Sequence, residues 1–200
     1  MPRPQSYLTG PASSKTLPRR AGSSRSGGLL VLLLALAVAL GVFLWARAIT
    51  PDYTASLFGQ SAADTFPLKS WMASGVAALA LWQLASALWI YGKLGPTRHP
   101  RWLGPAHRLS GAAAILISLP IARHCLVAYG FRSLDARTLI HSIAGCFFYG
   151  AVAAKITVVH TRRLSGLALP IAGGALVTLV AALWYTSALW YFNGFKLPGL

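Results

Sequence analysis

Four histidines of this sequence lie at mirrored positions on two neighbouring apolar segments: His107 and His124 on the first, His141 and His160 on the second. If the two segments cross a bilayer as antiparallel neighbours, His124 lies level with His141 and His107 lies level with His160. Ionisable side chains at membrane depth are costly to bury, so they are candidates for function. Two imidazoles that meet at one depth supply the axial ligands that a b-type haem needs.

The spacing of these histidines predicts two separate levels rather than one metal site with many ligands. The first two are seventeen residues apart and the second two nineteen, which on ideal helices corresponds to roughly 25 Å and 28 Å. Because a helix turns by about 100° per residue, neither pair shares a face of its own helix. Two haems would therefore lie on opposite sides of the plane of the hairpin, walled in by other helices.

His124 and His141 form the better ligand pair. Both lie within apolar sequence, where an ionisable residue needs an explanation. Gly145 follows His141 by one turn, and so small a residue leaves room for a flat macrocycle. We therefore predict that these two histidines bind the iron of haem b.

His107 and His160 form a weaker second pair. Both lie where their apolar segments end, beside Arg108 and the pair Arg162 and Arg163. A histidine at a membrane interface has no burial cost that a ligand would have to explain, so the position of this pair alone does not call for a second haem.

Three basic residues near these histidines are candidates to neutralise haem propionates: Arg123, Lys155 and Arg108. Lys155 follows His141 by fourteen residues, which places it only about 40° away around the helix. It could pair with a propionate, a quinone oxygen or a helix-end carbonyl, or its long side chain could reach the membrane surface. Arg123 is either a propionate partner or an anchor in the outer leaflet.

Two cysteines also lie inside these segments, Cys125 and Cys146. Together with His124 and His141 they could complete a site for a soft metal such as copper or zinc. Each cysteine, however, points about 100° to 140° away from the histidine on its own helix. The geometry favours two small packing residues.

The composition places the chain among multi-pass membrane proteins. Of its 200 residues, 56% are hydrophobic and 10% are charged, and the mean hydropathy is +0.58. The apolar residues come in runs of eighteen or more, the length that a transmembrane helix needs. The net charge of +15 resides mostly in short segments between these runs, where it sets topology, so we expect a lipid bilayer and no nucleic acid as partner.

We predict an all-α membrane bundle of about five transmembrane helices. The expected spans are residues 29–46, 70–91, 105–130, 138–160 and 167–192. Residues 1–28 are rich in Ser, Gly, Pro and Arg, which predicts a disordered basic tail. Residues 68–192 would form a four-helix bundle beside the first span, and residues 193–200 a short tail.

The distribution of Lys and Arg predicts the orientation. Eleven lie on the side of the amino-terminal tail and five on the other side, where all three acidic residues, Asp52, Asp64 and Asp135, also lie. The positive-inside rule then gives a cytoplasmic amino terminus and an outside carboxyl terminus in the plasma membrane. The first span could alternatively be a secretory signal cleaved near Ala48, although its length favours an uncleaved helix.

One stretch of the chain also supports a resemblance. The run His-Arg-Leu-Ser-Gly at residues 107–111 is followed by His124 on the same helix and by His141 and Gly145 on the next. This arrangement resembles the histidine-bearing hairpin of transmembrane b-type cytochromes and ferric-reductase-like domains. Over about residues 68–192 the chain also looks like a short bacterial member of a multi-pass membrane family of unknown function. The resemblance implies haem-mediated electron transfer across or into the membrane.

Two classes of function follow from these residues. In the first, the chain relays electrons through haem b, and a redox partner protein or a quinone supplies or accepts them, because the sequence offers no flavin or nicotinamide domain. Any enzyme activity would then be that of a membrane oxidoreductase subunit. In the second, the chain is a structural or assembly subunit or a small transporter, and its histidines form hydrogen bonds between helices.

Overall fold

The regular structure of the protein is helical. The computed structural model describes residues 23–95, 98–161, 166–197 and 199. Five helical segments in them are long and apolar enough to cross a membrane: α1 (Ser23–Ala48), α2 (Ala62–Ile90), α3 (Leu103–Tyr129), α4 (Ala136–His160) and the run of α5 (Ala168–Trp184), η1 (Tyr185–Leu189) and α6 (Trp190–Phe192). The prediction of an all-α bundle with five spans is confirmed. Most of the predicted tail, together with Arg162 and Arg163, lies outside the described residues.

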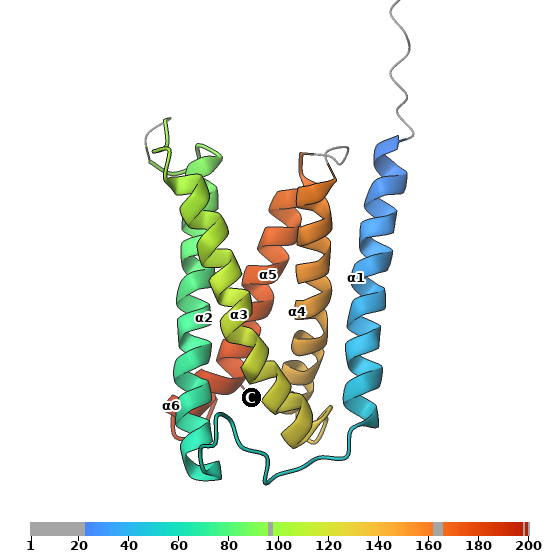
Figure 1. Cartoon of the computed structure of the whole chain (residues 1–200), viewed down its shortest axis with the longest axis vertical. Coiled ribbons are helices and arrows are strands. Elements are labelled where there is room, and N and C mark those ends of the chain that lie inside the picture. The colour runs from blue at the N-terminus through green and yellow to red at the C-terminus, as the bar shows by residue number, and fades with distance from the viewer. Residues whose placement is uncertain (1–22, 96–97, 162–165, 198, 200) are drawn as a thin grey trace, which may run out of the picture.

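The spans alternate in direction, so the bundle has two ends (Figure 1). At the upper end, as drawn there, α1 begins, α2 is followed by α3, and α4 is followed by α5. At the lower end α1 is joined to α2 and α3 to α4. The positive-inside prediction assigns the upper end to the cytoplasm.

The neighbours of α3 differ from those that we predicted. α3 packs along α2, whereas α4 packs along α1 on one side and α5 on the other. α3 lies near α4 from the lower end up to mid-span, where the Tyr149 hydroxyl is 3.5 Å from the hydroxyl of Ser118, and it leans away from α4 toward the upper end (Figure 1). The close hairpin of these two spans is therefore wrong over its upper part, because polar side chains of α2 hold the first turns of α3.

The contact of α1 with α4 depends on a glycine. Gly150 of α4 faces the backbone of α1, where a Cβ atom would overlap the carbonyl oxygen of Ala35 and touch the Cβ of Ala39 at 3.3 Å. Small residues at a helix interface let backbones approach closely, and such packing is a main source of stability in a bilayer. Gly150 thus fixes how closely α1 lies against α4.

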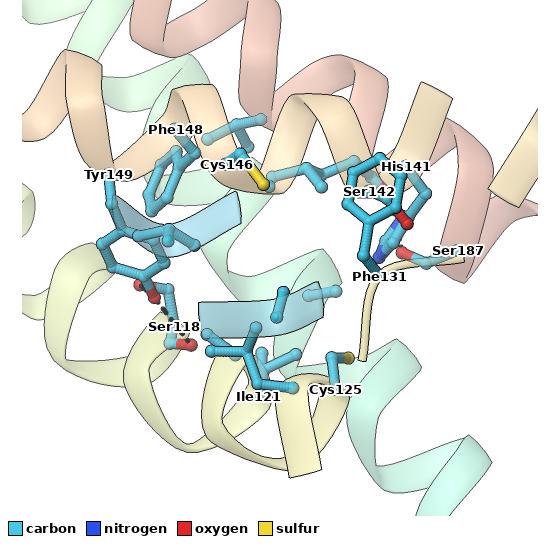
Figure 2. A pocket seen from close by; sticks show the side chains of 18 of the residues that line it. Ser118, Ile121, Cys125, Phe131, His141, Ser142, Cys146, Phe148, Tyr149 and Ser187 are labelled. Atoms are coloured by element: carbon cyan, nitrogen blue, oxygen red, sulfur yellow. Dashed lines mark hydrogen bonds between the residues drawn. The ribbon is translucent and has the colours of Figure 1, made fainter. Parts of the chain in front are cut away.

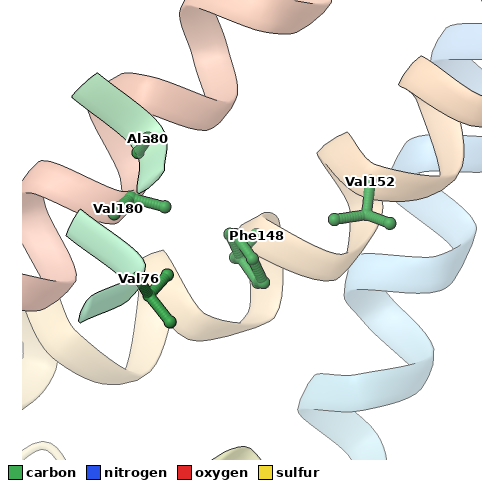
Figure 3. Close-up of a cluster of buried hydrophobic side chains, with 5 residues drawn as sticks. All are labelled: Val76, Ala80, Phe148, Val152 and Val180. Atoms are coloured by element: carbon green, nitrogen blue, oxygen red, sulfur yellow. The ribbon is translucent and has the colours of Figure 1, made fainter. Parts of the chain in front are cut away.

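A small apolar cluster holds α2, α4 and α5 together (Figure 3). Its buried members are Val76, Ala80, Phe148, Val152 and Val180. The leucines of α1 are largely exposed, which suits side chains that contact lipid. The cluster lies beside the site described below, because Phe148 and Val180 also line its cavity.

The second span begins earlier than we predicted. α2 starts at Ala62 and includes Pro67, although proline is disfavoured inside a helix. Ser61 caps the helix by accepting a hydrogen bond from the amide of Asp64, and the acidic residue stands in the first turn. The cap and the helix dipole offset the single backbone hydrogen bond that Pro67 removes.

The start of α4 is fixed in a similar way. Asp135 and Thr138 form a reciprocal capping box. The amide of Thr138 donates to the Asp135 carboxylate at 2.7 Å and is the main reason why the pKa of that carboxyl lies below its usual range. In the connection that precedes α4, the amide of Phe131 donates to the carbonyl of Ala46 at 3.1 Å. These bonds set the position of the first turns of α4, which carry His141.

Gly150→Leu should separate α1 from α4. Overpacking of this kind costs on the order of 1–3 kcal/mol, so we expect a lower midpoint of thermal unfolding in detergent. The matched control is Gly174→Leu, because Gly174 is exposed on α5 with no atom within 4 Å of a Cβ. Equal midpoints for the two variants would contradict the close approach.

Candidate functional site

A cavity lies where α3 and α4 diverge (Figure 2). It measures about 150 Å³. All five spans contribute to its walls, and most of the lining is apolar. Its polar lining includes Ser118, Cys125, His141, Ser142, Cys146 and Ser187.

His141 is held at the wall of this cavity by a single oriented hydrogen bond. Its Nδ1 lies 2.9 Å from the Oγ1 of Thr186. That hydroxyl donates its only proton to the carbonyl of Ala182 at 2.7 Å, so it must accept a proton from Nδ1. The Nε2 atom of His141 therefore carries a lone pair, and no described residue is seen to donate to it.

The partner of His141 sits in an unusual turn. Thr186 lies in η1, a π-helical turn, and such turns are frequent at functional sites. Arg137, one turn before His141, donates to the carbonyl of Thr186 at 3.1 Å and lies 3.8 Å from the ring centre of Trp190. Thr186 is fully buried. Sequence reasoning missed this residue, and the only signal for it was a threonine inside an apolar span.

His124 lies at the same height as His141 but has other partners. Each is five residues from the lower end of its helix. The Nε2 of His124 donates to the carbonyl of Ala55 at 3.0 Å, and its Nδ1 accepts from the ammonium of Lys69 at 3.4 Å. Both ring nitrogens are thus engaged, and His124 is not among the residues that line the cavity.

His107 belongs to a second group of polar residues, near the upper end. We call Gln83, Ser86, His107, Ser110 and Lys155 the upper polar cluster. The Nδ1 of His107 lies 2.7 Å from the Oγ of Ser86. The amide of Gln83 donates to the His107 carbonyl and to the Ser110 hydroxyl, and its oxygen accepts from Lys155 at 3.3 Å. The cluster connects α2 with both α3 and α4.

The remaining predicted residues lie apart from the cavity. The Nδ1 of His160 contacts a carbonyl of its own helix, that of Ile156, at 2.8 Å, and His160 is exposed. Arg108 and Arg123 are exposed as well. Fourteen residues of α4 separate Lys155 from His141, or roughly 21 Å of helix. The structure thus brings no second histidine to His141 and keeps Lys155 and Arg108 distant from it.

The described part of the chain contains no group of three or more His, Cys, Asp or Glu side chains that could hold a metal ion. Cys125 and Cys146 are free thiols on opposite walls of the cavity. This finding gives no support to the soft-metal alternative. A haem iron, which needs only one or two protein ligands, is a separate case.

Comparison with known proteins places the chain in a family. The model of a family of unknown function (DUF6529) matches residues 28–199. The chain belongs to DUF6529. None of the curated proteins and none of the solved structures matches it. For this DUF6529 protein the predicted resemblance to b-type cytochromes therefore stays a prediction.

The side chains of the DUF6529 protein meet part of what haem b requires. His141 fits, because it lines an apolar cavity and its Nδ1 proton has a fixed acceptor, which leaves a lone pair on Nε2. The cavity of about 150 Å³ is smaller than typical ligand sites, which measure roughly 300–1,000 Å³, so the helices around it would have to move apart to admit a haem. His124 does not fit as it stands, because the carbonyl of Ala55 occupies its Nε2.

Thr186→Val should destabilise the DUF6529 protein, because the Nδ1 proton of His141 then has no acceptor. An unsatisfied buried donor costs about 1–3 kcal/mol, so the thermal unfolding midpoint in detergent should fall. Adding His141→Leu should remove most of that penalty, which a double-mutant cycle measures. Thr178→Val is the control, since Thr178 is exposed and bonds only to its own helix. Equal effects of the two threonine variants would refute the assigned hydrogen bond.

Proposed function

We propose that this protein binds haem b in the plasma membrane and relays electrons, with His141 as an axial ligand. The observation that carries the proposal is that His141 lines an apolar cavity while its Nδ1 is bonded to Thr186, which leaves Nε2 with a lone pair. Metal-binding histidines almost always donate their other ring proton to a fixed acceptor, and Thr186 is that acceptor here. A bound haem would supply one-electron chemistry.

The chain prepares this site in two ways. First, the capped start of α4 and the contacts of Arg137 fix the height and direction of the imidazole. Second, the apolar walls exclude water and keep the local dielectric low, and both tune a redox group. Gly145 also lines the cavity, one turn after His141, and adds no side chain beyond its Cα.

His124 is the candidate for a second axial ligand. It lies at the same height on the helix across the cavity, and it would have to exchange its hydrogen bond to the carbonyl of Ala55 for the iron. If it does not, the iron has one histidine ligand. The spin state of the bound iron distinguishes these cases.

The cations that suit a group bound at His141 differ in part from those that we predicted, because only Arg123 was among the predicted ones. Lys69 and Arg137 both interact electrostatically with His141, and Arg123 is adjacent in sequence to His124. Lys155 and Arg108 lie toward the upper end, so they are too distant to neutralise the propionates of a haem bound at His141. A redox partner protein or a quinone completes the proposed relay.

A second candidate function is structural. Three histidines form hydrogen bonds between separate segments: His107 with Ser86, His124 with Ala55, and His141 with Thr186. These bonds favour a non-redox assembly subunit or small transporter, in which imidazoles join helices inside the bilayer.

The two candidates give different visible spectra. We expect the purified protein to show b-type bands in the dithionite-reduced minus oxidised spectrum, and His141→Ala to lose them. His99→Ala should keep them, because His99 lies exposed in the connection between α2 and α3. External imidazole should restore bands to His141→Ala if that variant folds, which a monodisperse elution profile verifies.

Two results would overturn the haem proposal. One is a colourless wild-type protein from haem-replete cells that also fails to take up added haem. The other is a His141→Ala variant that remains folded and keeps the full haem content. Either outcome leaves the structural candidate, which predicts a lower unfolding midpoint for all three interhelical histidine variants and no pigment.

A further inference from the structure

We propose that the upper polar cluster binds the oxygen-bearing head group of a quinol, with Lys155 and His107 as the contacting residues. A quinol at this site would exchange electrons with the proposed haem, so the role of the site rests on the proposed function. Lys155 lies roughly 21 Å along α4 from His141. Binding itself does not require haem, so it can be measured separately.

Lys155 supplies a cation without a carboxylate partner. All three acidic residues of the chain, Asp52, Asp64 and Asp135, lie in or beside the lower connections. In the part of the chain that the structure describes, the ammonium makes one hydrogen bond, to the neutral amide oxygen of Gln83 at 3.3 Å. An ammonium has three protons to donate, so two remain for a ligand oxygen.

His107 supplies an acceptor next to this cation. Ser86 donates its hydroxyl proton to the carbonyl of Trp82 at 2.6 Å, so it must accept the Nδ1 proton of His107. The Nε2 of His107 then carries a lone pair, and the Gln83 side chain bridges the two residues by donating to the His107 carbonyl and accepting from Lys155. A donor cation and a neutral acceptor thus stand together.

The residues behind this pair fix its geometry. Gln83 and Ser86 are buried, whereas His107 and Lys155 are only partly buried. The Gln83 amide nitrogen is directed to two oxygens of α3, which turns its own oxygen toward Lys155. Gly111 makes room for this arrangement, since a Cβ there would lie 3.1 Å from the Gln83 oxygen. The contacting groups are therefore preorganised and reachable.

This pair of groups selects the chemistry of the ligand. A quinol ring carries an O–H that can donate to the Nε2 of His107 and a second oxygen that can accept from Lys155. Its apolar tail suits a site inside a membrane helix bundle. A phospholipid phosphate satisfies Lys155 but brings no proton for His107, and a lone pair facing an anionic oxygen is unfavourable. The cluster thus fits a quinol better than a lipid head group.

Fluorescence titration with a quinol analogue, a hydroxyquinoline N-oxide with a heptyl tail, tests the site. Lys155→Met should weaken binding by about tenfold or more, the usual loss for a hydrogen bond to a charged group. Lys155→Arg should restore most of the affinity. Lys93→Met is the matched control, because Lys93 is an exposed lysine just beyond the end of α2, and it should bind as the wild type does.

The histidine is tested in the same way. His107→Phe should weaken binding of the analogue, and His99→Phe should not. Three results would overturn the proposal: a wild-type protein that does not bind the analogue, equal affinity in Lys155→Met and Lys93→Met, or full displacement by an equal concentration of short-chain phosphatidylglycerol. Measuring haem-loaded and haem-free protein separates the two hypotheses, since loss of haem should leave the analogue bound.

Discussion

Polar side chains inside a bilayer must find their hydrogen-bond partners within the protein, and this constraint organises the whole bundle. His141 is hydrogen-bonded to the hydroxyl of Thr186, His124 to the carbonyl of Ala55, and His107 to the hydroxyl of Ser86. Each bond joins two segments that apolar packing alone would leave free to slide. The splay of α3 from α4 follows from these bonds, because His107 of α3 is satisfied by α2 and His124 by the connection between α1 and α2, whereas Ser118 at mid-span keeps its contact with α4.

The same bonds decide which ring nitrogens remain available for chemistry. A serine or threonine hydroxyl has one proton, and at both Ser86 and Thr186 it is given to a carbonyl of its own helix. The neighbouring histidine must therefore protonate Nδ1 and present Nε2 as a lone pair. Backbone carbonyls of α2 and α5 thus set the tautomers of His107 and His141. His124, which donates to a carbonyl directly, has the opposite tautomer.

The general fold could be predicted from the sequence because each span is a long apolar run, and such a run has one structure in lipid. The common height of His124 and His141 also followed, since both are counted from the same short connection. Their different hydrogen-bond partners could not be predicted from the sequence. The rotation of α3 about its own axis depends on which neighbouring helix accepts the hydrogen bonds of Gln83, and this helix is α3 itself. The π-helical turn that contains Thr186 has no recognisable sequence pattern. The start of α2 at Ala62 could not be predicted either, because Pro67 is a residue that usually interrupts a helix.

The tautomer of His141 is the point on which the account depends most directly. Nitrogen NMR of the protein with isotope-labelled histidine, in bilayers at neutral pH and without haem, reads it for each ring. We expect His141 to be neutral, with a protonated Nδ1 and a bare Nε2, and Thr186→Val to change that signal while leaving the signal of His99 unchanged. A protonated Nε2 on His141 would contradict the account, because Nε2 would then have no lone pair to offer a ligand.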